Sequence, residues 1–116
     1  MANFEKLNVY QKALDFSYIV YQITENWPKS ELFGITSQLR RAALSIALNI
    51  AEGSSRSTKD FSHFLTIARG SCYECIPILT IATRVKYLRA TDYQKLYTDV
   101  ETLSKMINAL RRSLTE

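Results

Sequence analysis

The stretch from residue 38 to residue 53, which reads QLRRAALSIALNIAEG, restricts the fold more than any other part of the chain. Its apolar residues recur every three or four positions, the spacing of one face of an amphipathic helix. That face consists of Leu39, Ala42, Ala43, Ile46, Ala47 and Ile50. Ser45, Asn49 and Glu52 form a strip beside it, so polar groups are expected at the edge of the core. Gly53 is predicted to end the helix.

Three further stretches have the same helical period. Pro28 is predicted to end the first of them, because the residue before a proline disfavours helical geometry. No stretch alternates as a strand would, and the chain contains only three Gly and two Pro. The predicted helices cover residues of about 7–27, 35–52, 58–88 and 91–114. Short loops between them predict an all-α, up-down antiparallel four-helix bundle, with residues 1–116 as a single domain.

Local signals mark some of the helix ends. Ser57 followed by Asp60 is similar to a capping box and predicts the start of the third helix. Thr91 followed by Gln94 predicts the start of the fourth in the same way. Pro77 lies inside the third helix, where the missing amide predicts a kink.

The antiparallel arrangement predicts contacts between the second and third helices. If the chain turns around near residue 55, the numbers of facing residues sum to about 110. Gly70 then faces residues 40–43 and would let the two helices approach closely. Glu74 lies within a turn of Arg40 and Arg41, so an ion pair is expected. The further hydrogen bonds expected along this seam involve Asn49 and Ser71.

The sequence gives little support for catalysis. No Glu-x-x-His pair, phosphate-binding glycine loop or nucleophile elbow is present. His63 is the only histidine, and we interpret it as a solvated helix residue. Cys72 and Cys75 form a lone C-x-x-C, whereas zinc needs four ligands, so packing is favoured over a redox or metal role. We predict no catalytic residue, no metal ligand and no cofactor.

The formal net charge of +4 is unevenly distributed. Residues 57–89 carry five Lys and Arg against two Asp and Glu. Arg84, Lys86 and Arg89 lie at the end of this segment, where cations favour a helix C-terminus through the macrodipole. The alternative interpretation is that these positive residues form a weak nucleic-acid binding surface.

The sequence also bears on location. No apolar run approaches the ~20 residues of a membrane span, and the N-terminus lacks a signal-peptide core. We therefore expect a cytoplasmic protein that does not interact with membranes.

Several motifs at fixed spacing carry a resemblance that extends over nearly the whole chain. They are Leu7-x-Val9-Tyr10-Gln11-x-Ala13, Pro28-x-x-Glu31-x-Phe33-Gly34, Gln38-Leu39-Arg40-Arg41-Ala42, Ser45-Ile46, Asn49-Ile50-Ala51-Glu52-Gly53, Arg56 and Phe61-x-x-Phe64-Leu65-x-x-Ala68-x-Gly70-Ser71-x-x-Glu74. The sequence resembles the S23-like family, small bacterial four-helix-bundle proteins known from intervening sequences of 23S rRNA genes. The accessory variability protein of diversity-generating retroelements is a relative of that family.

The resemblance implies a homopentamer of bundles around a central channel. It also implies RNA or DNA as a partner, or a reverse transcriptase or other protein, because the retroelement relatives bind both. The residues expected to form a nucleic-acid or oligomer surface are Arg40, Arg41, Arg56 and Arg69. The residues expected to build the structural seam are Asn49, Glu52, Gly53, Gly70, Ser71 and Glu74.

Three functional hypotheses follow. The first is a non-catalytic oligomeric scaffold whose assembled ring presents arginines to structured nucleic acid. The second is a protein-interaction adaptor of a mobile element with no nucleic-acid role. The third is an enzyme or metal protein that uses Cys72, Cys75 and His63.

Overall fold

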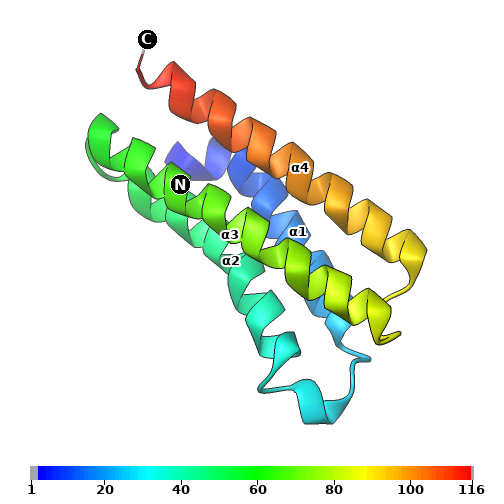
Figure 1. Ribbon diagram of the computed structural model, residues 1–116. Coiled ribbons are helices and arrows are strands. Elements are labelled where there is room, and N and C mark those ends of the chain that lie inside the picture. The colour runs from blue at the N-terminus through cyan, green and yellow to red at the C-terminus, as the bar shows by residue number, and fades with distance from the viewer. Residues whose placement is uncertain (1–2, 116) are drawn as a thin grey trace.

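The computed structural model describes residues 3–115, and this part of the chain contains helices and no strand. Four long helices form a bundle, which confirms the predicted fold class (Figure 1). The elements are the 3-10 helix η1 (Asn3–Lys6), α1 (Asn8–Thr24), the 3-10 helix η2 (Lys29–Glu31), α2 (Ile35–Ser54), α3 (Thr58–Arg84) and α4 (Ala90–Ser113).

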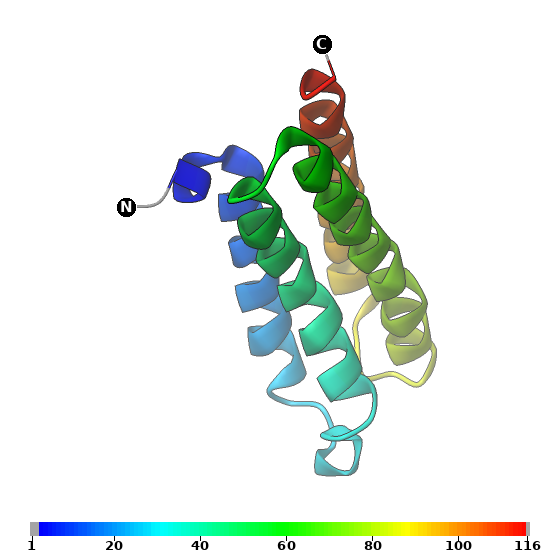
Figure 2. The same cartoon turned by 90° about the vertical axis from the view of Figure 1, so that its left-hand side faces the viewer.

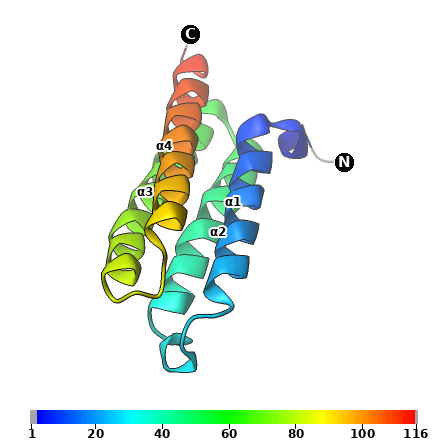
Figure 3. The same cartoon turned by 90° about the vertical axis from the view of Figure 1, so that its right-hand side faces the viewer.

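Successive helices run antiparallel and occupy neighbouring corners of the bundle (Figures 2 and 3). Each helix packs against the next one in sequence, and α1 also packs against α4 and closes the bundle. Both chain ends therefore lie at the same end of a body that measures 45 × 22 × 20 Å. The largest fully buried side chains, from all four helices, are Phe16, Leu39, Ile46, Ile50, Leu65, Leu79, Leu96, Leu103 and Ile107.

Gly53 does not end α2, contrary to the prediction. The helix continues to Ser54, Gly53 is buried, and no glycine in the described residues has a positive φ. A Cβ atom at Gly53 would lie 2.6 Å from Cβ of Phe64 and 3.0 Å from Cδ1 of Phe61. Gly53 is therefore required for the close approach of α2 and α3 next to their turn, and any side chain there would collide with α3.

The two ends of α3 differ in how well the sequence predicts them. Its start agrees with the prediction, because the Asp60 amide donates to Oγ of the N-cap Ser57 at 3.2 Å. Its end comes four residues earlier than predicted, at Arg84. Lys86 adopts a left-handed conformation with φ of 71° and reverses the chain there.

The start of α4 also differs from the prediction. The helix begins at Ala90, with the extended residue Arg89 as its N-cap and no side-chain hydrogen bond to the cap. Thr91 lies inside the first turn, so the predicted capping box with Gln94 is wrong. Arg89 instead donates to the carboxylate of Asp92 at 3.3 Å. The negative charge of Asp92 in the first turn is stabilised by the positive end of the helix dipole.

The third helix runs without a break through Pro77. The kink near that residue stays a prediction, although the missing amide does not end the helix. Among the described helices, α3 alone is long and apolar enough to cross a membrane, so the prediction that no apolar run approaches that length is wrong. Because Leu65, Cys72 and Leu79 of α3 are fully buried in the bundle, we interpret it as a core helix.

Candidate functional site

The pairing of α2 with α3 is shifted from the predicted register. Ser71 Oγ donates to Ser45 Oγ at 3.0 Å, which places these two residues opposite each other. The predicted register would have placed Ser71 opposite Leu39, about six residues away. The numbers of facing residues therefore sum to about 116, although α2 ends at Ser54 and α3 begins at Thr58, so the turn itself lies close to its predicted position.

Of the hydrogen bonds expected along this seam, the one from Ser71 joins the two helices, whereas those of Asn49 stay within α2. Besides the bond from Ser71, Ser45 receives two from the side-chain amide of Asn49, at 2.8 Å to the carbonyl oxygen and 3.0 Å to Oγ. Gly70, in contrast, does not face α2. It is exposed, and a Cβ atom there would meet nothing within 4 Å. The expectation that Gly70 allows close approach of the helices is therefore wrong.

Arg40 is directed toward α1 and not toward α3. Its Nε donates to Oγ1 of the buried Thr24 at 2.8 Å, and its guanidinium lies 4.6 Å from the centroid of the Tyr21 ring. Glu25 completes the contact at 3.8 Å. The expected ion pair with Glu74 is therefore absent, and Arg40 joins α1 to α2.

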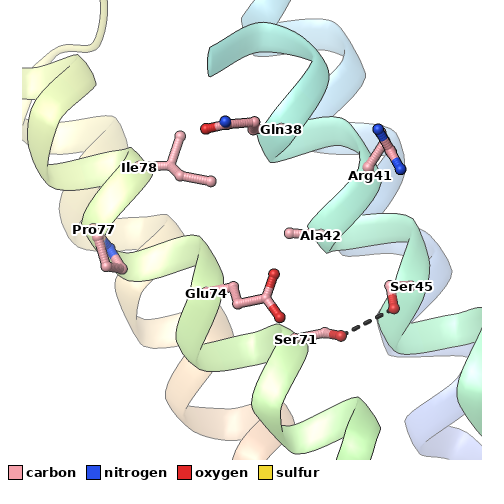
Figure 4. A pocket seen from close by; sticks show the side chains of 8 residues that line it. All are labelled: Gln38, Arg41, Ala42, Ser45, Ser71, Glu74, Pro77 and Ile78. Carbon is pink, nitrogen blue, oxygen red and sulfur yellow. Dashed lines mark hydrogen bonds between the residues drawn. The ribbon is translucent and has the colours of Figure 1, made fainter. Parts of the chain in front are cut away.

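Arg41 and Glu74 lie on the same groove between α2 and α3, although they form no ion pair. Both are exposed, and neither forms a hydrogen bond or ion pair within residues 3–115. Figure 4 shows the Glu74 carboxylate directed into the space between the two helices, while Arg41 extends from the outer side of α2. The groove encloses about 630 Å³. Its other lining residues are Gln38, Ala42, Ser45, Ser71, Pro77 and Ile78.

Aliphatic side chains accompany these two charges. Leu48 follows Arg41 by seven residues, and Ile67 and Ile81 lie seven residues before and after Glu74, so each set shares one helix face. Leu48, Ile67 and Ile81 are 57%, 40% and 47% exposed. We call these five residues the outer α2–α3 face. It combines an unpaired cation, an unpaired anion and exposed apolar groups.

The remaining predicted arginines lie elsewhere. Arg56 is near the α2–α3 turn, where it pairs with Glu52 at 3.3 Å and covers the Phe64 ring at 5.1 Å. Arg69 faces α4, and its Nε donates to Ser104 Oγ at 3.2 Å. The predicted arginines thus do not converge on one patch within a protomer.

The cysteines are core residues. Both Cys72 and Cys75 are fully buried and free, and burial raises the pKa of each thiol to about 12. Thiols held protonated in this way are inert, which supports the packing interpretation. His63 is exposed, and among residues 3–115 no three His, Cys, Asp or Glu side chains are grouped as metal ligands.

A second groove, which was not predicted from the sequence, lies between α3 and α4 and has a volume of about 430 Å³. The helical spacing of Arg69 and Tyr73 was the available signal, because residues four apart share a helix face. Their partners on α4 depend on the pairing of the two helices, which the sequence does not specify. We call this the α3–α4 groove; its lining includes Arg69, Tyr73, Pro77, Tyr97, Glu101 and Lys105.

Comparison with known proteins identifies the family. The family described as "23S rRNA-intervening sequence protein" matches residues 5–109. The chain belongs to this family. A search of curated proteins finds no match.

A crystal structure of a protein with unknown function from the S23 ribosomal protein family of Bacteroides thetaiotaomicron VPI-5482 has the same fold. Its TM-score is 0.82, it is 24% identical in sequence, and the alignment covers 90% of this chain and 95% of that one. The family predicted from the sequence motifs is thus confirmed. At this identity, the structural likeness between the two proteins concerns the fold alone.

Proposed function

We propose that this chain is a non-catalytic, oligomeric helical scaffold whose assembled form binds structured nucleic acid through arginines. The observation that carries the proposal is the outer α2–α3 face, where two unpaired charges of opposite sign lie among exposed aliphatic side chains. Exposed apolar groups among polar ones are typical of protein interaction sites.

A second copy of the chain is the partner that fits this face. Arg41 on one protomer and Glu74 on the next have complementary charges, and Leu48, Ile67 and Ile81 supply apolar area for the same contact. Where the Arg41 side of this face meets the Glu74 side of the next protomer, the contact is head-to-tail, and head-to-tail contacts close into rings when the rotation allows. The pentamer implied by the family resemblance is one such ring.

Assembly also supports the nucleic-acid part of the proposal. A single chain has a formal charge of +4, which is modest, whereas five copies of +4 carry +20. Phosphate contacts on neighbouring protomers act together, because binding at one raises the effective concentration at the others. Affinity for RNA or DNA then falls steeply with salt as counterions are released.

A charge exchange tests the assembly. Arg41→Glu places two acids at the contact and should reduce the oligomer mass measured by light scattering, and adding Glu74→Arg should restore it. Arg112→Glu changes the same charge at an exposed position outside the outer α2–α3 face and serves as the matched control. A wild-type monomer at micromolar concentration, or equal masses for Arg41→Glu and Arg112→Glu, would refute the proposed contact.

A salt series tests nucleic-acid binding on the same preparation. We expect the multimer to bind structured RNA or DNA tightly at low salt, with log K falling linearly against log salt concentration. If the intact multimer binds neither RNA nor DNA at low salt, the proposed nucleic-acid function is refuted.

The adaptor alternative has an observation of its own. Phe33, between η2 and α2, is 94% exposed, and the adjacent Leu32 is 46% exposed. A large aromatic side chain in that position suits an anchor for a protein partner. Capture of the same partner from nuclease-treated lysate by wild type, and its loss with Phe33→Ser, would favour an adaptor of a mobile element.

A further inference from the structure

The α3–α4 groove has a volume suited to a small ligand. Its volume of about 430 Å³ lies within the ~300–1,000 Å³ of small-molecule sites. Unlike the outer α2–α3 face, the groove has positive charge at one end and apolar rings at the other. A ligand that fits the groove should therefore have a negative group at one end and a flat apolar group at the other.

The charged end is built around Arg69. Its Nε donates to Ser104 Oγ at 3.2 Å, its Nη2 donates to the Tyr73 hydroxyl at 3.2 Å, and its guanidinium lies 5.3 Å from the Tyr73 ring centroid. A guanidinium has five N–H donors, so these bonds fix its position and leave three for a ligand. The exposed Lys105 follows Ser104 directly and adds a second cation. A fixed guanidinium beside an ammonium suits a phosphate group.

The apolar end lies further along both helices. Pro77 comes eight residues after Arg69, or about 12 Å along the axis, and the Tyr97 ring of α4 lines the same part of the groove. Tyrosine rings stack on nucleobases. Pro77 has no amide hydrogen and presents only its apolar ring to the groove.

Glu101 lies between the two ends, one turn before Ser104 on α4. Its carboxylate repels a phosphate and accepts hydrogen bonds from hydroxyl groups. Acidic residues bind ribose hydroxyls in this way in dinucleotide sites. The order along the groove is thus cation, carboxylate and aromatic ring, which matches phosphate, ribose and base.

We propose that the α3–α4 groove binds a ribonucleotide, with phosphate on Arg69 and Lys105, ribose on Glu101 and the base against Tyr97 and Pro77. The ligand has two sources, a free nucleotide or one unit of a single-stranded RNA. The second source rests on the proposed nucleic-acid function, but the groove lies within one protomer and needs no assembly.

Titration of the full-length chain with adenosine 5′-monophosphate, followed by amide chemical shifts, tests the site. We expect shifts confined to residues 69–77 and 97–108, and affinity about tenfold higher than for adenosine, inorganic phosphate or the 2′-deoxy nucleotide, since each lacks a hydrogen-bonded group. Lys105→Gln should weaken binding about tenfold. Lys59→Gln, the same change at another exposed lysine, should leave it unchanged.

The two sources separate in a parallel titration with a short single-stranded adenosine oligonucleotide. Binding of the oligonucleotide but not the mononucleotide, with the same loss in Lys105→Gln, assigns the groove to a strand. Failure of both ligands to bind, or equal binding by Lys105→Gln and Lys59→Gln, overturns the proposal. If structured RNA still binds the multimer in that case, the proposed function stands without this site.

Discussion

Replacing glycine by alanine is expected to have opposite effects on the free energy of unfolding at two positions of the bundle, Gly53 and Gly70. At Gly53 a new Cβ atom would lie 2.6 Å from Cβ of Phe64 and 3.2 Å from its Cγ, whereas ordinary carbon contacts are ~3.5–4.0 Å. The colliding atom is attached directly to the backbone, so α2 and α3 must separate by about 1 Å. At Gly70 the new atom meets nothing within 4 Å.

The expected magnitudes follow from two opposing terms. Alanine favours a helix interior over glycine by about 1 kcal/mol. Overpacking a tight contact costs about 1–3 kcal/mol, and the collision with Phe64 lies at the upper end of that range. Gly53→Ala should therefore lower the free energy of unfolding by about 2 kcal/mol, while Gly70→Ala should raise it by about 1 kcal/mol.

Urea unfolding followed by circular dichroism, at one fixed protein concentration, measures both values. A stabilising Gly53→Ala would mean that the two helices separate at little cost, and would refute the argument from close packing. A destabilising Gly70→Ala accompanied by a smaller oligomer mass would show that another copy covers Gly70, contrary to the open space found beside it.

Three further predictions concern single side chains. Arg40→Ala should lower the free energy of unfolding by about 1–2 kcal/mol by removing the bond to Thr24, whereas Arg41→Ala should change it by less than about 0.5 kcal/mol; equal effects in urea unfolding would contradict this contrast. The pKa of Cys72 and Cys75 is raised by burial to about 12 from 9.0, so the stability that they contribute is fully present below pH 9 and is lost as the pH rises toward 12. A double Cys→Ala variant should therefore show a shallower decline in unfolding free energy from pH 9 to 11, and an unchanged slope would contradict the raised pKa. Lys86→Gly should raise the free energy of unfolding by about 1 kcal/mol, because glycine adopts the φ of 71° without strain; no gain in thermal or urea unfolding would mean that the lysine is unstrained.

The fold was predictable because the apolar stripes of the four helices are long and regular. The ends of the helices were harder to predict, because one residue type can have different structural roles. Gly53 has the sequence context of a helix stop, yet its role is to let Phe64 approach, and only the position of α3 reveals this. Lys86 carries no sequence signal for a left-handed conformation, which glycine normally supplies.

The candidate sites were less predictable, because they depend on register between helices. The predicted register between α2 and α3 was displaced by about six residues. It paired Glu74 with Arg40, whereas Arg40 faces α1 through Thr24. The bond from Ser71 was foreseen, since this residue lies on the edge of the buried stripe in any register near the true one. The bonds from Asn49 are made within α2 and do not depend on register.

The order of helices around the bundle has a consequence for how the chain folds. Every long helix packs against its neighbours in sequence, so most of the core forms between segments joined by short turns. Among the four long helices of the described chain, α1 with α4 is the pairing most distant in sequence. Low contact order of this kind favours fast folding. The tight α2–α3 turn at Gly53 is expected to form early, with α1 and α4 docking afterwards. The seam that closes last, between α1 and α4, is then the first to open under partial unfolding, and hydrogen exchange would detect it there.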